Sequence, residues 1–449
     1  GVGPKTAEKI VAAFGTDSLK ILETAPERLT EIDGISRKKA LEIGASFRQQ
    51  VAVRRLIEFL AGYRIPAQVA VRLYRVYGAQ SLERVQEDPY LLAQPQFGAG
   101  FGAADQLALE LGFDGDDARR VEAGVIFELR HNLTNGHTFL PQDKLVAATS
   151  QLLSLEAEPV IAAVDRLTEL GRVEHSTIAG IAAVYLPEYY EAETAIAARI
   201  RAMAQHPPAP LPDAERVLQG IEAIAGITYA ERQRDAIRMA AERRIMILTG
   251  GPGTGKTTVL SGILTLFSKL GRKTLLAAPT GRAAKRLSEL TGRDAATIHR
   301  LLEAQVSPEN GEMFFARNED EPLECDAVIV DEMSMVDVLL MHSLLEALPQ
   351  EACLVLVGDP DQLPSVGAGS LFSDLRSGIV PSVCLTEIFR QARQSLIVMN
   401  AHAVNRGELP VLTAKDRDCF FLRRRAPAQL VQTVCELCAR RLPQNMHIP

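Results

Sequence analysis

The sequence predicts a multidomain protein in which a helical region and a small mixed unit precede an α/β domain with a parallel sheet. Three observations support this prediction. Residues 1–115 repeat a helix–turn–helix pattern, residues 116–190 show the pattern of three helices and two short strands, and residues 228–390 alternate apolar strands with helices. Alternation of the last kind is typical of a parallel sheet covered by helices on both faces. A chain of 449 residues has room for several such domains.

The helical region contains an internal repeat. Residues 1–29 align with residues 64–92, and residues 32–43 align with residues 97–109. The repeated unit is therefore a pair of helix–turn–helix elements that occurs twice.

Two turns of this region place glycines just before a helix and basic residues just after the turn. Such turns resemble the helix-hairpin-helix motif, whose exposed backbone N–H groups suit a DNA phosphate. The alternative for both is helix packing without DNA. The turn at residues 98–102 repeats the glycines without a nearby Lys or Arg, so phosphate contact is less expected there. The candidate DNA-binding residues are Gly1, Gly3 and Lys5 in the first turn and Gly34, Ser36 and Lys38 in the second.

Residues 116–190 predict a winged-helix-like unit, because three helices are followed by two short alternating strands. Such folds often bind DNA. Glu and Ala dominate the candidate recognition helix, so a scaffolding role is an equal alternative. Residues 191–227 predict a helix and a Pro-rich linker that leads to the α/β domain.

A glycine-rich loop follows a buried strand and precedes a helix in the stretch IMILTGGPGTGKTTVL, residues 245–260. This context and the spacing G-x-x-x-x-G-K-[ST] are those of a P-loop, which binds a nucleoside triphosphate. Backbone N–H groups and the helix N-terminus face the phosphates. Lys256 is the expected partner of the β- and γ-phosphates, and the Thr257 hydroxyl is an expected Mg²⁺ ligand. The expected ATP-binding residues of the loop are Gly251, Pro252, Gly253, Thr254, Gly255, Lys256, Thr257 and Thr258.

Polar residues follow three further apolar strands, at residues 274–278, 327–330 and 353–357. Ligands of open α/β sheets bind at this end of the strands. Asp331, directly after the second of them, is the expected carboxylate ligand of Mg²⁺. Its neighbour Glu332 is the expected general base that polarises the attacking water.

Four sequence motifs follow GGPGTGKTT in order: APTGRAA, DEMSMVD, GDPDQLPSVGAG and LTEIFRQ. They resemble motifs Ia, II, III and IV of superfamily 1 DNA helicases, and most of all those of the RecD-like branch. The helix-hairpin-helix units resemble those of its long members, which act without RecB and RecC. The resemblance implies a RecA-like ATPase domain with Mg²⁺ and ATP as cofactors. It also implies 5′→3′ movement on single-stranded DNA, unwinding of tailed duplex DNA in repair or recombination, and no obligatory protein partner.

The resemblance also assigns roles to residues of the ATP site. Gln233 matches the glutamine that reads adenine, although an ordinary surface glutamine of a helix is the alternative. Gln362 matches the γ-phosphate sensor that couples ATP state to DNA grip. Arg390 matches the arginine that stabilises the charge of the transferred phosphoryl group.

For DNA, Pro279, Thr280 and Arg282 match positions where the family holds the strand backbone. His299 falls near the next contact, with packing inside a helix as an equal alternative. Residues 303–323 predict a hairpin insertion, which in the family parts the duplex. Phe314 is its candidate for stacking on a base, and anchoring of the hairpin is the alternative.

Residues 391–449 match only the opening of the family's second RecA-like domain, and motifs V and VI are not found. Because two such domains close on ATP together, the chain is expected to be a nucleotide- and DNA-binding fragment if that domain is missing. Two other functions remain open. One is the helicase portion of a conjugative relaxase, although its nuclease residues are not seen. The other is a DNA-binding ATPase switch that does not unwind.

Composition adds general limits. The formal net charge is −7, so DNA contacts are expected to be local and not spread over a basic surface. No run of about 20 apolar residues is present, so no membrane is expected as a partner. The scattered cysteines favour a reducing cytoplasm.

Overall fold

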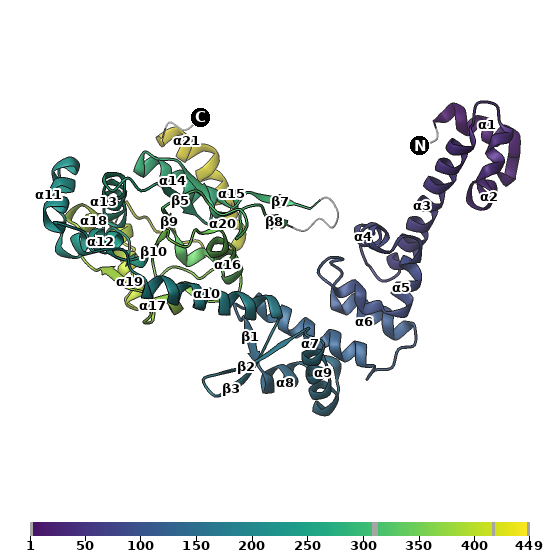
Figure 1. The fold of residues 1–449 in the computed structure, drawn as a ribbon, viewed down its shortest axis with the longest axis horizontal. Coiled ribbons are helices and arrows are strands. Elements are labelled where there is room, and N and C mark those ends of the chain that lie inside the picture. Colours follow the sequence, from purple (N-terminus) through teal and green to yellow (C-terminus); the bar gives the residue numbers. More distant parts are fainter. Residues whose placement is uncertain (1–2, 308–312, 415–417, 447–449) are drawn as a thin grey trace.

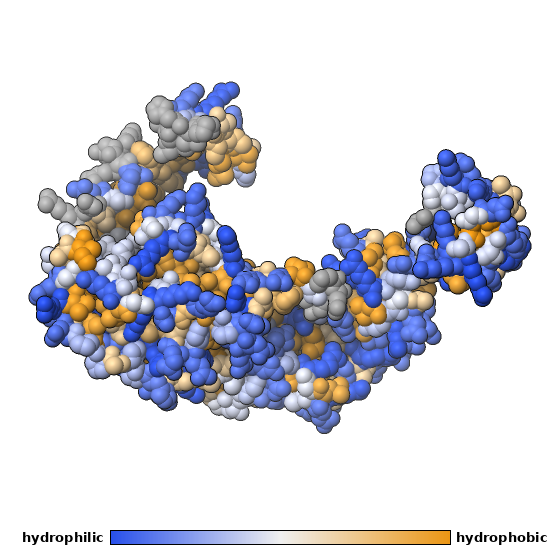
Figure 2. All heavy atoms as spheres, turned by 45° about the horizontal axis from the view of Figure 1, so that its top comes forward, coloured by the Kyte–Doolittle hydropathy of each residue, from blue (hydrophilic) through white to orange (hydrophobic). Residues whose placement is uncertain are grey.

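The computed structural model describes residues 3–307, 313–414 and 418–446. A helical arm, a small mixed unit and an α/β domain follow one another along the chain (Figure 1). The space-filling view shows a broad hollow between the arm and the α/β domain (Figure 2). Within the described ranges, no helix is both long and apolar enough to cross a membrane.

The arm shows the internal repeat as structure. Each copy runs helix, 3-10 turn, helix, 3-10 turn, helix, which confirms the predicted tandem helix-hairpin-helix region. The first copy packs around its own small core, which includes Ile10 and Leu29. The helices are α1 (Pro4–Phe14), α2 (Ser18–Thr24) and α3 (Arg37–Ala61), then α4 (Ala67–Tyr77), α5 (Ser81–Glu87) and α6 (Phe101–Glu110).

The small unit contains three helices and a three-stranded antiparallel sheet of order β1-β3-β2. Its strand β1 was not predicted, because three residues are too few for an alternating pattern. One core joins this unit to the second helical copy, from Leu56 to Leu186. The elements are α7 (Ala118–Leu133), β1 (Phe139–Pro141), α8 (Gln142–Leu153), α9 (Ala157–Glu169), β2 (Glu174–Ile178) and β3 (Ile181–Tyr185).

The α/β domain is built on a six-stranded parallel sheet of order β11-β4-β10-β9-β5-β6, which confirms the predicted fold class. Strands β4, β9 and β10 are buried along their whole length. The two edge strands were not predicted, because they are short and only partly apolar. The strands are β4 (Ile245–Gly250), β5 (Thr274–Ala278), β6 (Ala295–Thr297), β9 (Ala327–Val330), β10 (Cys353–Gly358) and β11 (Ser382–Leu385).

Helices cover both faces of this sheet (Figure 1). Two of them precede the sheet in sequence: Ile196 and Ile200 of α10 lie in the core of one face, and Leu218 and Ile221 of α11 lie in the core of the other. The Pro-rich stretch, residues 207–212, joins these two helices. The helices of the domain are α10 (Pro187–Gln205), α11 (Ala214–Ala225), α12 (Glu231–Glu242), α13 (Lys256–Lys269), α14 (Gly281–Thr291), α15 (Ile298–Leu301), α16 (Val338–Ala347) and α17 (Leu371–Arg376).

The last part of the chain forms short helices beside the sheet. They are α18 (Arg390–Arg393), α19 (Leu396–Asn405), α20 (Pro427–Glu436) and α21 (Leu442–Met446). No residue of α20 is buried.

The small unit touches the α/β domain through a glycine. The Gly369 N–H donates to the Gly136 carbonyl at 3.0 Å. Gly369 has φ +98°, and a Cβ there would lie 2.4 Å from Val338 Cγ2.

We therefore expect Gly369→Ala to lower the free energy of unfolding by about 1–3 kcal/mol, as overpacking does. Denaturant titration measures this, with Gly115→Ala as the control because that site is open. Equal values for both variants would contradict the packing described.

Candidate functional site

A cavity of about 830 Å³ opens at the carboxyl ends of β4, β9 and β10. Parallel strands bring these ends to one edge of the sheet, so residues far apart in sequence meet there. The cavity is lined by most of the predicted ATP-site residues: Gly251, Pro252, Gly253, Thr254, Gly255, Lys256, Thr257, Thr258, Asp331, Glu332 and Gln362.

The P-loop connects β4 to the first turn of α13. Gly255 caps α13 with φ +85°, a conformation that L side chains rarely adopt. A Cβ there would also lie 2.6 Å from Gln233 Nε2 and 3.0 Å from the Phe389 ring. The Thr254 hydroxyl donates to the Gly251 carbonyl at 2.9 Å and closes the loop. The loop is thus held in shape by its own residues and by α12.

The Lys256 ammonium lies folded back on its own loop. Its Nζ donates to the Gly251 carbonyl at 3.3 Å and also contacts the Gly250 carbonyl. A phosphate oxygen is a stronger partner than a neutral carbonyl, because the hydrogen bond joins two charges. The geometry therefore leaves Lys256 ready to exchange these carbonyls for an anion.

Two carboxylates face this lysine across the cavity. The Asp331 N–H donates to the Ala277 carbonyl at 2.9 Å, which fixes Asp331 at the end of β9. The Glu332 N–H donates to Asp331 Oδ1 at 2.9 Å. Glu332 has φ +54°, an uncommon conformation for this residue type that marks local strain.

The donor set fits Mg²⁺. Thr257 and Asp331 offer a hydroxyl and a carboxylate oxygen in the same cavity, and hard cations prefer oxygen ligands. Burial raises the pKa of Asp331 and the Glu332 charge raises it further, while Lys256 and Arg286 lower it. The nearby positive charges do not fully offset the cost of burying the Asp331 carboxylate, and a bound cation would offset it further.

Replacing Asp331 by asparagine is expected to stabilise the magnesium-free protein by about 1 kcal/mol at neutral pH. Burial raises the folded-state pKa of Asp331, so the carboxylate costs stability once the pH rises through that value. The gain should therefore disappear at acidic pH, where the wild-type carboxyl is neutral. Thermal unfolding at two pH values measures it. A loss of stability at neutral pH would show that the carboxylate is already well compensated.

Gln362 lies opposite the P-loop, after β10. Its side-chain Oε1 accepts a hydrogen bond from the Ser334 hydroxyl at 3.3 Å. Ser334 follows Asp331 and Glu332 in the turn after β9. The turn after β9 and the loop after β10 are therefore joined directly beside the cavity.

Gln233 is 4% exposed, which excludes the alternative of an ordinary surface glutamine. Its Oε1 accepts from the Ala230 N–H at 3.1 Å. Its amide nitrogen lies beside Gly255, so the side chain supports the P-loop from α12.

The sequence reasoning missed several residues that line this cavity. Arg286 and Leu290 share one face of α14, which places a guanidinium near Asp331. Their spacing of four residues predicts a shared helix face, but the sequence alone does not show that this face of α14 lies toward the P-loop. His402 of α19 also contacts the loop, with Nε2 3.0 Å from the Pro252 carbonyl oxygen. Arg390 starts α18, and its side chain lies outside the described residues, although Phe389 lines the cavity.

The predicted strand-holding residues lie after β5. The Thr280 hydroxyl caps α14 by accepting from the Ala283 N–H at 3.2 Å. Pro279 directly precedes this cap, and Arg282 is exposed in the first turn of α14. A helix start with an exposed arginine is a suitable place for a phosphate.

The hairpin insertion is formed by β7 (Ala304–Val306) and β8 (Met313–Phe315), which pair antiparallel. Its predicted turn lies outside the described residues. The His299 ring lies 5.8 Å from the Phe315 ring, centroid to centroid, at the base of the hairpin. Phe315 packs on the core, whereas Phe314 is 46% exposed. Of the two phenylalanines, Phe315 anchors the hairpin and Phe314 is available to a ligand.

The helix-hairpin-helix candidates lie at the far end of α3, away from the ATP cavity (Figure 1). Gly3 precedes α1 in an extended conformation, and Lys5 is exposed. The Ser36 hydroxyl caps α3 by accepting from the Lys39 N–H at 3.3 Å. Gly34, with φ +90°, turns the chain before this cap, and Lys38 is exposed behind it. Gly1 lies outside the described residues.

Comparisons with protein families match three parts of the chain. The SAM-like helix-hairpin-helix tandem matches residues 1–48. The HHH domain of the ATP-dependent RecD2 DNA helicase matches residues 49–139. The AAA domain matches residues 233–368, which supply most of the lining of the cavity, including the P-loop, Asp331, Glu332 and Gln362.

Individual relatives agree with the family matches. The chain is 35% identical over 91% of its length to the ATP-dependent RecD2 DNA helicase of Deinococcus radiodurans, of which it spans 57%. It is 37% identical over 44% of its length to the RecBCD enzyme subunit RecD of Mycolicibacterium smegmatis, of which it spans 38%. The solved structure of the Pif1 helicase from Candida albicans aligns with 41% of this chain and 45% of its own chain, at 24% identity and a TM-score of 0.31.

Proposed function

Because the chain is a RecD2-like protein, we propose that it carries the ATP-hydrolysing lobe and the DNA-guiding units of an ATP-dependent DNA helicase. One observation carries this proposal: a single cavity collects the P-loop, the Asp331–Glu332 pair and Gln362. The chain spans little more than half of the RecD2 helicase that it matches, so the activity of the whole protein is part of the proposal.

ATP hydrolysis at this cavity uses residues with separate tasks. Lys256 and the P-loop N–H groups bind the phosphates, and Arg286 adds positive charge from α14. Thr257 and Asp331 would hold Mg²⁺, which would supply positive charge to the phosphates when bound. Glu332 accepts a proton from the attacking water. The Arg390 role, stabilisation of the transferred phosphoryl group, rests on the resemblance.

The turn after β9 and the loop after β10 connect the ATP cavity with the rest of the protein and so couple the nucleotide in the cavity to DNA binding. Gln362, the residue that the resemblance makes the γ-phosphate sensor, lines the cavity and accepts a hydrogen bond from the Ser334 hydroxyl at 3.3 Å. The same loop continues to Gly369, which bonds to Gly136 of the small unit at 3.0 Å. A movement of Gln362 on ATP binding or hydrolysis can therefore be transmitted along this loop to the small unit.

DNA is held at several separate surfaces. Pro279, Thr280 and Arg282 contact the strand backbone, and the hairpin with Phe314 and His299 meets the point where strands part. The helix-hairpin-helix turns contact phosphates of the duplex. Hairpin strands β7 and β8 project toward the helical arm, which is consistent with duplex lying between them (Figure 1).

Translocation is proposed to run 5′→3′, as in the RecD-like branch, with a role in repair or recombination in the cytoplasm and no obligatory protein partner. Duplexes with a 5′ or a 3′ single-stranded tail test this. The whole protein, with the second RecA-like domain that the resemblance implies, should separate the 5′-tailed duplex in the presence of Mg-ATP and leave the 3′-tailed one intact. Unwinding from a 3′ tail would contradict the polarity.

ATP turnover without separation of either duplex would favour the second candidate, a DNA-binding ATPase switch. One contact supports this candidate: the loop after β10 bonds to the small unit. A switch needs only such a connection between the ATP cavity and a DNA-binding unit.

A further inference from the structure

The segment of residues 389–402, which contains α18 and the first part of α19, lies directly against the P-loop. A Cβ on Gly251 would be 2.7 Å from His402 Cε1, so the imidazole ring rests on the backbone of that glycine. At Gly253 a Cβ would clash with the Ala392 Cβ. The glycines of the loop therefore allow this segment to approach the loop backbone, which side chains would prevent.

His402 holds one carbonyl group of the loop. Its Nε2 lies 3.0 Å from the Pro252 carbonyl oxygen. A carbonyl oxygen only accepts hydrogen bonds, so Nε2 carries the proton and donates to it. The Phe389 N–H donates to the next carbonyl, that of Gly253, at 3.3 Å. Two consecutive carbonyl groups of the P-loop are therefore bound by the 389–402 segment.

These two bonds fix the directions of two N–H groups. A peptide group is planar, and in the trans form, which the loop adopts, its C=O and N–H point to opposite sides. The N–H groups of Gly253 and Thr254 therefore point away from the 389–402 segment. Neither N–H has a hydrogen-bond partner among the residues that the structure describes. Gly253 has φ +75°, a left-handed conformation in which successive N–H groups can converge on one anion.

The position of His402 is itself fixed by the chain that follows α19. Asp418 accepts from the Ser395 hydroxyl at 2.5 Å, at the start of the helix. The Asn400 amide donates to the Val411 carbonyl at 3.0 Å and accepts from the Val411 N–H at 2.8 Å. Because α19 is held on both sides, the imidazole is in place before a ligand arrives and loses little conformational entropy when one binds.

We propose that His402 is a positioning residue for the phosphates of ATP. Its hydrogen bond keeps the Pro252–Gly253 peptide group turned so that the Gly253 N–H faces the bound phosphates. Without this donor the peptide group can rotate, because glycine adopts either sign of φ. The Pro252 carbonyl oxygen would then face the anion and repel it.

His402 is not among the described residues that line the cavity, so it acts on ATP through the loop. This inference rests on the proposed function, since ATP is the ligand of the loop.

Isothermal titration with Mg-ATP compares the wild-type chain with His402→Leu and His402→Gln. Leucine has no donor, so the ATP affinity of His402→Leu should fall about fivefold, as the net loss of one hydrogen bond does. Glutamine carries an amide N–H at nearly the reach of Nε2, so His402→Gln should restore most of the affinity. His175→Leu, which replaces an exposed histidine of β2 in the small unit, is the matched control and should bind as wild type does.

Gly251→Ala tests the same contact from the side of the loop. Its Cβ would displace the imidazole, because the two would lie 2.7 Å apart. The variant should lose affinity alone but lose little more when combined with His402→Leu, because both changes remove one contact. Full additivity of the two losses would show that they act separately and would contradict the inference.

Magnesium pyrophosphate, used as a competitor of ATP, carries phosphates without a base or a ribose. The same loss of affinity for it in His402→Leu places the effect at the phosphates. If His402→Leu binds both ligands as tightly as wild type does, or if His402→Gln binds as weakly as His402→Leu, the inference is wrong. A loss confined to ATP would also overturn it. A wild-type chain that binds neither ligand would instead refute the proposed function.

Discussion

The Glu332→Gln variant is expected to bind Mg-ATP as well as wild type does and to hydrolyse it about 10²–10⁴-fold more slowly, which is the usual contribution of a general base. Glutamine keeps the size and the turn conformation but cannot accept the proton from water. The strained backbone at Glu332, φ +54°, is consistent with a side chain placed for this purpose.

Single-turnover hydrolysis and equilibrium binding of ATP separate the two effects. Glu346→Gln, on the exposed side of α16, is the matched control and should change neither. A Glu332→Gln variant with normal turnover would show that the base is another group. Loss of ATP binding together with turnover would show that Glu332 acts on the structure of the site.

The Lys256→Ala variant should lose ATP affinity by about 30-fold or more, because removing one partner of a buried charge pair costs about 2–5 kcal/mol. The nucleotide-free protein should fold normally. In that state Lys256 binds only the carbonyls of its own loop, and water replaces the ammonium there.

Isothermal titration with Mg-ATP measures this loss. Lys269→Ala is the matched control, since it removes the same charge from the last turn of the same helix, α13. Equal affinities for the two variants would mean that Lys256 does not meet the phosphates.

Much of the fold could be predicted from local pattern. Strands β4, β5, β9 and β10 are apolar runs followed by polar residues, and the two helical copies repeat in sequence, so each signal lies within one segment. Strands β1, β6 and β11 are too short to show a period. Their pairing depends on neighbours far away in the chain.

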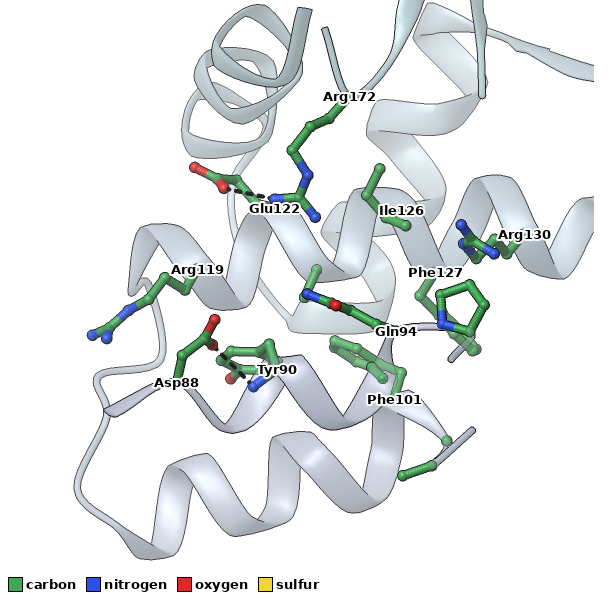
Figure 3. Close-up of a pocket in the computed structure, with 15 residues that line it drawn as sticks. Asp88, Tyr90, Gln94, Phe101, Arg119, Glu122, Ile126, Phe127, Arg130 and Arg172 are labelled. Carbon is green, nitrogen blue, oxygen red and sulfur yellow. Dashed lines mark hydrogen bonds and ion pairs between the residues drawn. The ribbon is translucent and has the colours of Figure 1, made fainter. Parts of the chain in front are cut away.

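The residues of the candidate sites also fall into those that a local motif predicts and those that only tertiary packing brings together. The P-loop and the Asp331–Glu332 pair are contiguous motifs, and the strand order then brings them to one cavity. Arg286 reaches this cavity only because α14 packs with one particular face toward the P-loop. The turn at residues 98–102 has no Lys or Arg close behind it in sequence, yet Arg130 and Arg172 of the small unit line the same cavity as Gly100 (Figure 3). Such contacts come from tertiary packing, which no local pattern records.

We propose that the ATP cavity and the surfaces that bind single-stranded DNA are energetically coupled. The most direct test is the affinity of the Glu332→Gln chain for a labelled single strand, without nucleotide and with saturating Mg-ATP. We expect ATP to change this affinity about fivefold or more, and the strand to change ATP affinity by the same factor, because coupling is reciprocal. The same affinity for the strand in both conditions would contradict the account.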